Sequence, residues 1–238
     1  MRWPVLARRQ ALWVPTLWGW ALAFIFLAAA CVLVGQKIHS FLAPDQPVGA
    51  RLLVVEGWMA PEQLDQAIAR FRDGSYGSLI TTGGPVSADL ARNTPTSYAD
   101  LARAYLVQHG IPSSAVIAVP APASAQERTY LSAVMVRLWL AQSGNTIEAL
   151  DVFSAGVHSR RTWTLYRMAF GPKVGVGILA ARPIDYDPDA WWKTSTGAKS
   201  VISEAISWIW TKLFFQPPAQ GSHEEKWGLA QQPVQNAK

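Results

Sequence analysis

Residues 52–84 read LLVVEGWMAPEQLDQAIARFRDGSYGSLITTGG, and this stretch decides the fold class of the 238-residue chain. It opens with an uninterrupted apolar run at 52–55, which is typical of a strand buried on both faces. Apolar residues then recur at helical spacing over 62–72, after Pro61, a residue favoured in the first helical turn. Residues 78–82, Ser-Leu-Ile-Thr-Thr, are predicted to form a second strand, which two glycines end. This order predicts two parallel strands joined by a helix.

The alternation of strand and helix continues along the chain. Gly175-Val176-Gly177 falls inside a predicted strand rather than in a strand-to-helix turn, so it is not a dinucleotide-binding fingerprint. We expect an α/β domain over residues 51–215, with a parallel sheet of about five strands and helices on both faces. Its further strands are predicted at 115–119, 147–153 and 174–180, and its further helices at 97–109, 125–142, 159–170 and 199–214.

A long apolar segment precedes the domain. Residues 11–34 contain no charged side chain. As a helix they would extend about 36 Å, which exceeds the roughly 30 Å of a bilayer core. Three arginines lie in the first nine residues, and Lys37 is the first basic residue after the segment. The positive-inside rule therefore predicts a cytoplasmic stretch at 1–10, a transmembrane anchor at 11–35 and a domain outside the cytoplasm.

Two other interpretations of this segment stay open. Signal peptides have a shorter apolar region, but the three alanines at 28–30 resemble the small residues of a cleavage site. Cys31 directly follows them, as the lipidated cysteine does in lipoproteins. Since Cys31 is the single cysteine, the chain has no internal disulfide framework.

The segments on either side of the domain are predicted to lie outside its folded core. Residues 36–50 contain Pro44 and Pro47 and are predicted to form a linker. Residues 216–238 are rich in Gln and Pro, have few periodic apolar positions, and are predicted to be a disordered tail.

Composition excludes several classes of protein. The net charge is +5, from 21 basic and 16 acidic residues spread along the chain, so we predict no nucleic-acid partner. The sequence contains no GxSxG, HExxH, Walker or CxxC pattern. With four histidines and one cysteine, it indicates no dedicated metal site. No cofactor can be assigned.

Polar residues gather where the predicted strands end, the edge at which open parallel sheets bind ligands. Glu56 ends the first strand, so its carboxylate is expected to be partly buried. Gly83 and Gly84 follow the second strand and allow backbone N–H groups to approach an anion. Thr82 adds a hydroxyl group. An ordinary tight turn explains the two glycines equally well.

The third and fourth strands bring further candidates to this edge. Glu127 begins the next helix, as a base, a hydrogen-bond acceptor or simply a first-turn acid. Ser154 ends the fourth strand, and His158, Arg160 and Arg161 lie where the next helix starts. Arginines there oppose the helix dipole, so a phosphate or carboxylate clamp is the functional interpretation. Surface charge at a helix start is the alternative.

These features resemble those of a bacterial family of unknown function that includes the SanA, ElyC and YdcF envelope proteins. The resemblance covers about residues 51–215. It rests on the strand that ends in Thr82-Gly83-Gly84, on Glu127, and on the segment 153–161, which looks like the family's strand followed by His-x-x-Arg. A helix that closes in QHGIP at 108–112 adds to it. The glycine-rich turn that often follows the first strand is replaced here by Glu56-Gly57-Trp58.

The resemblance implies a Rossmann-like fold, a single anchor in the bacterial inner membrane and a role in the periplasm or cell envelope. We expect the domain to bind an anionic, phosphate-bearing metabolite, with Glu127 and His158 as the acid–base candidates. A hydrolase or transferase acting on a lipid-linked or nucleotide-linked phosphate is one alternative. A non-catalytic scaffold for other envelope proteins, contacting them through the Trp-rich segment 199–214, is another.

Overall fold

The computed structural model describes residues 15–86, 97–123, 127–144 and 147–227. The chain divides into two compact units, 1–37 and 38–238. The first unit contains most of α1 (Leu17–Leu42), which is long and apolar enough to cross a membrane. Length and composition of this kind suit a membrane anchor and a signal sequence equally well.

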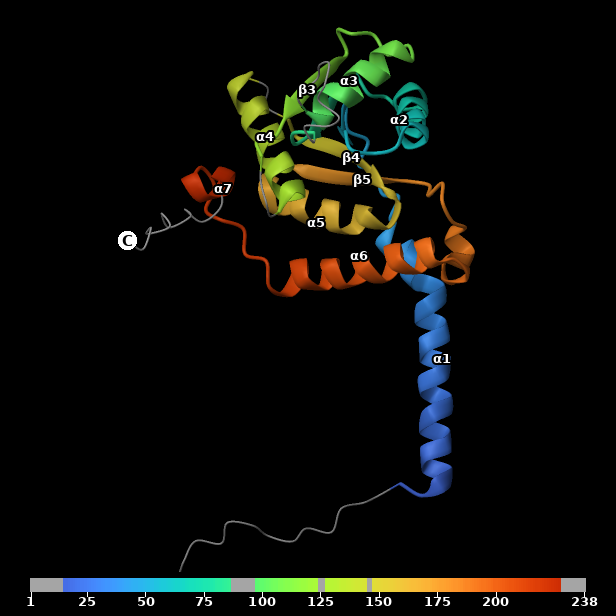
Figure 1. Cartoon of the computed structure of the whole chain (residues 1–238). Helices are drawn as coiled ribbons and strands as arrows, with labels where there is room; N and C mark the ends of the chain where they lie inside the picture. The colour runs from blue at the N-terminus through green and yellow to red at the C-terminus, as the bar shows by residue number, and fades with distance from the viewer. Residues whose placement is uncertain (1–14, 87–96, 124–126, 145–146, 228–238) are drawn as a thin grey trace, which may run out of the picture. The chain divides into compact units, whose positions relative to one another are not determined.

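The second unit is built on a five-stranded sheet in which all strands are parallel (Figure 1). The strand order is β3-β2-β1-β4-β5. This is the order found in Rossmann-like folds, and the α/β prediction is therefore confirmed. The strands are β1 (Leu52–Glu56), β2 (Ser78–Gly83), β3 (Val116–Pro120), β4 (Ala149–Ala155) and β5 (Gly175–Ala181).

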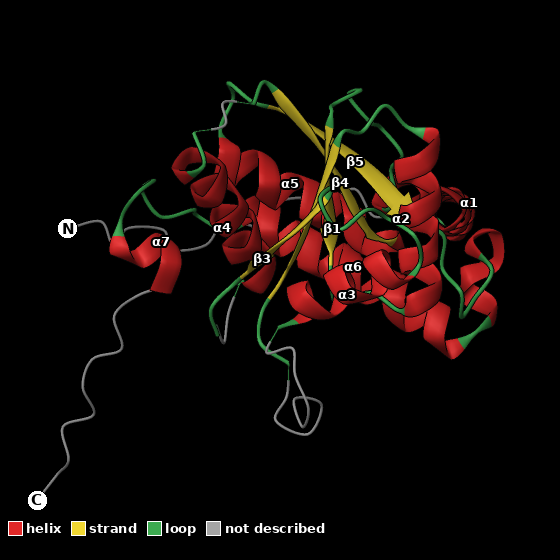
Figure 2. Cartoon of the chain, turned by 90° about the horizontal axis from the view of Figure 1, so that it is seen from above, coloured by secondary structure: helices red, strands yellow, loops and turns green. Residues whose placement is uncertain are grey.

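Helices cover both faces of the sheet (Figure 2). Along β1, Val54 packs towards α4 and α5, whereas its neighbours Leu53 and Val55 pack towards α2 and α3. Successive side chains of a strand point to opposite faces, so an uninterrupted apolar run serves both cores. The helices are α2 (Pro61–Asp73), α3 (Tyr98–Gln108), α4 (Arg128–Gln142), α5 (Ser159–Phe170) and α6 (Ser195–Leu213), with short helices η1 (Gly156–His158) and η2 (Pro188–Lys193).

The glycines of β5 have a packing role. Asp151 is fully buried on the neighbouring β4, where its carboxylate accepts hydrogen bonds from the N–H groups of Val48 and Ala50 and from the Tyr76 hydroxyl. A Cβ atom at Gly177 would lie 1.9 Å from Asp151 Oδ1. Gly177 is therefore a strand glycine that makes room for a buried, fully hydrogen-bonded carboxylate.

The first helix ends later than the sequence predicts. The anchor was expected at 11–35 and a linker at 36–50, but α1 continues to Leu42. Its last turn belongs to the second unit, where Leu42 is fully buried against Val157 of η1 and Val201 of α6. Further along the predicted linker, Gln46 pairs with Ile178 of β5 through two backbone hydrogen bonds. Residues 11–14 of the predicted anchor lie outside the described residues.

The segment after α6 also differs from its prediction as a disordered tail. Residues 216–227 are described and end in α7 (His223–Trp227), which lies beside α4. The Glu225 carboxylate is buried and pairs with Arg137 of α4, and the N–H of Gly221 also donates to it. This ion pair fixes a segment whose low apolar content gave no sign of packing. Residues 228–238 lie outside the described part of the chain.

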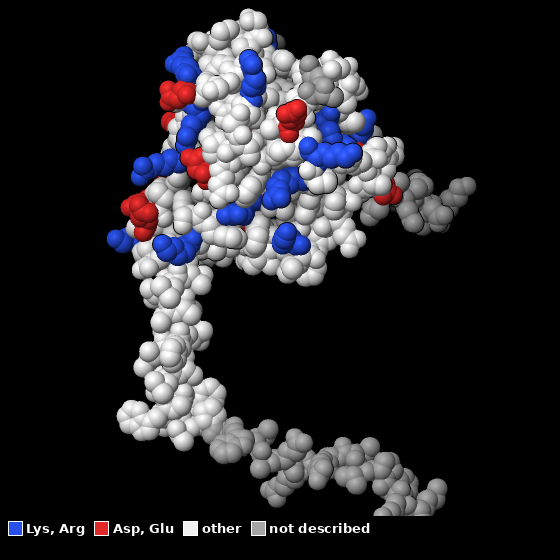
Figure 3. Space-filling view, turned by 180° about the vertical axis from the view of Figure 1, so that it is seen from behind, with Lys and Arg blue, Asp and Glu red and all other residues white. Residues whose placement is uncertain are grey.

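Charged side chains are spread over the surface of the domain. Figure 3 shows one face, where Lys and Arg side chains lie apart from one another with a few Asp and Glu side chains among them. The polar groups that do gather are found at the carboxyl ends of the strands.

Candidate functional site

A cleft of about 700 Å³ opens at the carboxyl ends of β1 and β2. From β1 the chain crosses to β2 on one side of the sheet, and β4 lies on the other side, so the strand order reverses at the centre. Ligands of open α/β sheets bind at this kind of switch point. Eight of the nine predicted site residues gather here: Glu56, Thr82, Gly83, Gly84, Glu127, His158 and Arg161 line the cleft, and Ser154 lies directly beneath it.

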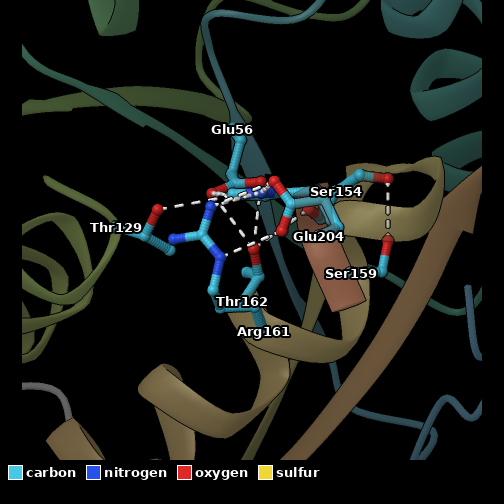
Figure 4. Close-up of polar contacts among 8 residues, drawn as sticks. Glu56, Thr129, Ser154, Ser159, Arg161, Thr162 and Glu204 are labelled. Carbon is cyan, nitrogen blue, oxygen red and sulfur yellow. Dashed lines mark hydrogen bonds and ion pairs between the residues drawn. The ribbon is translucent and has the colours of Figure 1, made fainter. Parts of the chain in front are cut away.

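Glu56 forms the floor of the cleft and is 2% exposed. Its carboxylate accepts a 2.5 Å hydrogen bond from Ser154 Oγ at the end of β4. The hydroxyl of Thr162, from the first half of α5, lies 3.4 Å from both carboxylate oxygens. Two strand ends and one helix therefore hold this carboxylate in a fixed position (Figure 4).

His158 stands between two carboxylates. Its Nδ1 lies 3.0 Å from Glu204 Oε1, and its Nε2 lies 3.8 Å from Glu56 Oε1 and 3.4 Å from Thr129 Oγ1. The edge of the ring packs at right angles to Trp58, with 5.2 Å between the ring centroids. Arg161 Nη2 also lies 3.0 Å from Nδ1. When Nδ1 carries the proton and donates it to Glu204, the lone pair of the ring is on Nε2.

Arg161 and Glu204 form a forked ion pair beside this histidine. Arg161 Nε lies 3.0 Å from Glu204 Oε2, and its Nη2 lies 3.1 Å from Oε1. Burial alone would raise the pKa of Glu204, but hydrogen bonds from His158 and Arg161 outweigh it and hold the pKa at about 2. Figure 4 shows the Arg161 guanidinium and the carboxylates of Glu204 and Glu56 converging on one point.

Glu127 has an unusual backbone conformation. It precedes α4 with φ 50° and ψ 40°, and it is the one described non-glycine residue with positive φ. A residue held in this region signals local strain, which is common at functional sites. Burial raises the pKa of the Glu127 carboxyl group, while the charge of Arg161 acts in the opposite direction.

Among the residues that the structure describes, no side chain caps the start of α4, which faces the cleft. Glu127 occupies the capping position, but only its backbone oxygen accepts a hydrogen bond, from the N–H of Leu131, and its side chain caps no N–H group. Arg128 and Thr129, the first two residues of α4, both line the cleft. Free N–H groups and the helix dipole make such an end favourable for an anion.

Thr82 places a further buried polar group at the cleft. It is 1% exposed, it lines the same cleft, and its hydroxyl oxygen has no hydrogen-bond partner among the described residues. Buried hydroxyl groups are almost always hydrogen-bonded, and leaving one unpaired costs about 1–3 kcal/mol. The hydroxyl of Thr82 is therefore available to a bound ligand.

The two glycines after β2 have different roles. A Cβ atom at Gly83 would lie 2.8 Å from Tyr98 Cβ, so this glycine makes room for the start of α3. A Cβ atom at Gly84 would meet nothing closer than 3.9 Å. Of the pair, Gly84 leaves open space for a ligand, whereas Gly83 is explained by packing.

Arg160 is the predicted site residue that lies elsewhere. Its Nε donates to the backbone oxygen of Phe41 at the end of α1, and its guanidinium lies over the rings of Phe41 and Trp163. The prediction of a ligand-binding role for both arginines is therefore not supported by the position of Arg160. Arg161, one residue later, turns into the cleft instead.

Sequence reasoning left several cleft residues out of the site. Glu204 is the most important, since it pairs with both His158 and Arg161. The sequence feature that could have identified Glu204 is its position on α6. It shares one helical face with Val201, Trp208 and Thr211, at spacings of three, four and three residues. The others that sequence reasoning missed are Trp58, Tyr98, Arg128, Thr129 and Thr162.

The site carries both signs of charge. Three acidic residues, Glu56, Glu127 and Glu204, line the cleft together with two basic residues, Arg128 and Arg161. Within the described ranges, no group of three or more His, Cys, Asp and Glu side chains is arranged to hold a metal ion. In searches of known proteins, neither a protein-family model nor a curated protein matches the chain.

Proposed function

We propose that the α/β domain binds a phosphate-bearing metabolite in the cleft at the carboxyl ends of β1 and β2. The observation that carries this proposal is the coincidence of two donor groups that have no side-chain partner in the described parts of the chain. The first turn of α4 and the buried hydroxyl of Thr82 line one cleft, and a phosphate oxygen can accept hydrogen bonds from both. Gly84 beside them leaves the backbone accessible.

Within this proposal the two arginines have different tasks. Arg128, at the first position of α4, supplies the positive charge for the phosphate. Arg161 is already neutralised by its forked pair with Glu204, so it orients His158 and Glu204 rather than adding net charge. Glu127 lines the same cleft, where burial raises the pKa of its carboxyl group and the charge of Arg161 acts in the opposite direction.

The second candidate is a hydrolase or transferase that acts on such a phosphate compound. It is favoured by the position of His158 in the lining of the cleft, with Glu204 on Nδ1 and with Thr129 and Glu56 beside Nε2. A carboxylate on one ring nitrogen fixes the tautomer and strengthens the other nitrogen as a base. In this reaction His158 would take the proton of a water or hydroxyl nucleophile, and Glu127 would be the candidate for donating a proton to the leaving oxygen.

The proposed cellular setting combines α1 with the family resemblance. As an uncleaved anchor, α1 would hold the domain outside the cytoplasm of a bacterium, as the charge distribution around it favours. The segment 153–161 and the strand end at 82–84 support membership of the SanA, ElyC and YdcF family. We infer a role in the biogenesis or maintenance of the cell envelope.

A thermal-shift screen of the full chain in detergent tests the binding proposal. The probes are inorganic phosphate, a sugar phosphate, a nucleotide sugar and a lipid-carrier phosphate. A probe at 100 times its Kd stabilises the folded state by about 2.7 kcal/mol. Arg128→Gln is expected to abolish the shift, whereas Arg160→Gln removes the same charge outside the cleft and should preserve it. A shift that survives in Arg128→Gln, or no shift with any probe, argues against the proposal.

A further inference from the structure

One face of α6 consists of large apolar side chains that nothing in the described chain covers. Ile202, Ile206, Ile209 and Leu213 recur at spacings of four, three and four residues, which puts them on one side of the helix. They are 47–69% exposed, and Trp210 and Phe214 beside them are 46% and 66% exposed. We call these six residues the apolar stripe of α6.

The opposite side of α6 faces the domain. Val201 and Thr211 are 1% exposed, and Glu204 reaches His158 and Arg161 in the cleft. The helix is therefore held in a fixed orientation by its buried side, and the apolar stripe must point away from the core. A contiguous exposed apolar surface of this kind marks a contact with another molecule or with a membrane.

The chain itself indicates which of these partners is present. The last turn of α1 packs beside α6. Leu42 belongs to one buried apolar cluster with Val201, and Phe41 packs edge-on against Trp208 with 5.0 Å between the ring centroids. The uncharged segment that can cross a membrane ends at about Gln36, six residues before Leu42. Six residues of helix extend only about 9 Å. With α1 as the uncleaved anchor of the proposed function, on which this inference rests, connectivity keeps α6 close to the point where the chain leaves the bilayer.

The remaining side chains of α6 fit the same environment. Its single acidic residue, Glu204, is engaged in the cleft, whereas its two basic residues, Lys199 and Lys212, are exposed. Helices that lie in the plane of a membrane interface combine an apolar face containing Trp, Phe and Leu with exposed lysines. Trp210 and Phe214 are of the residue types enriched at that depth.

We propose that α6 lies in the membrane–water interface, with its apolar stripe in contact with the acyl chains of the lipid bilayer. The domain would then have two attachments, the α1 segment and α6, which together fix its orientation on the membrane. This proposal concerns a surface and does not depend on what the cleft binds.

Lipid-attached quenchers test this contact in the full chain. The native thiol is removed by Cys31→Ser, and single cysteines are introduced by Ile206→Cys or Leu213→Cys to carry a fluorescent label. Leu101→Cys is the matched control, because Leu101 is an exposed leucine (37%) on α3. Each protein is reconstituted into phosphatidylcholine–phosphatidylglycerol vesicles that contain a nitroxide on the acyl chain.

We expect strong quenching at positions 206 and 213 and little at 101. Equal quenching at all three positions would overturn the proposal, since a domain attached through α1 alone gives no preference. Blue-shifted emission at 206 and 213 without lipid quenching would also overturn it, because a protein, either a second copy or another chain, would then cover the stripe. All three labels replace exposed side chains, so the fold is expected to be kept.

Discussion

Replacement of Glu204 by Gln should destabilise the domain by an amount that depends on pH. The substitution keeps the shape of the side chain and an acceptor oxygen, but it removes the charge that pairs with Arg161 and His158. The pKa of Glu204 is lowered from its ordinary value of 4.5 to about 2. At about 1.4 kcal/mol for each tenfold change in proton affinity, this difference corresponds to about 3 kcal/mol.

The sign of the pH dependence follows from the direction of this shift. A carboxylate whose pKa is lower in the folded state stabilises the fold fully above pH 4.5, and the stabilisation is lost as pH falls towards 2. The difference between the wild type and Glu204→Gln should therefore be about 3 kcal/mol at pH 7 and about 1 kcal/mol at pH 3. For a domain of this size, 3 kcal/mol corresponds to a decrease in Tm of about 6–12 °C.

Urea unfolding of the full chain in detergent, followed by tryptophan fluorescence at both pH values, measures this difference. Glu148→Gln is the matched control, because Glu148 is an exposed carboxylate, and its effect should stay within about 0.5 kcal/mol. Equal stability of Glu204→Gln and the wild type at pH 7, or a loss that does not change with pH, would refute the ion-pair reasoning.

Three further substitutions have distinct expected outcomes. Gly177→Ala places a methyl group against the buried Asp151 carboxylate of β4 and should destabilise the folded domain by about 1–3 kcal/mol or more. Urea unfolding measures this, with Gly35→Ala as the control, because the methyl group added there meets nothing within 4 Å. Ser154→Ala removes a hydrogen bond to the buried Glu56 carboxylate and should cost about 1.5–3 kcal/mol; an unchanged Tm would contradict that bond. Thr82→Val replaces a buried hydroxyl, which has no partner among the described residues, by a methyl group, and it should stabilise the unliganded protein by about 1 kcal/mol. It should also reduce the thermal shift caused by phosphate probes, and a variant less stable than the wild type would contradict the assignment of that hydroxyl.

The sequence predicts the strands and helices of the domain well because their signals are local. The run at 52–55 lies in β1, and the helix predicted at 159–170 matches the bounds of α5. Both segments have apolar periodicity and clear stop signals, such as the Gly171-Pro172 pair that follows α5. Because open parallel sheets bind ligands at the carboxyl ends of their strands, the strand ends alone assign most of the candidate site residues to one edge of the sheet.

The sequence is less informative where a contact depends on the direction of one side chain. Arg160 and Arg161 are neighbours, but consecutive helical residues point about 100° apart, and only Arg161 shares the buried face of α5 with Leu165. Glu204 lies 46 residues from His158 along the chain, so their pairing depends on how α6 docks. The burial of Leu42 and Glu225 likewise depends on tertiary packing, which the short segments around them do not predict.

A structure of the protein with a bound phosphate probe tests the central claim most directly. The account predicts that the phosphorus lies at the first turn of α4, with its oxygens within hydrogen-bond distance of Thr82 Oγ1 and of the N–H groups of Arg128 and Thr129. It also predicts that the Arg161–Glu204 pair stays intact. A phosphate bound by Arg161 with Glu204 displaced, or bound away from the cleft, would contradict the account.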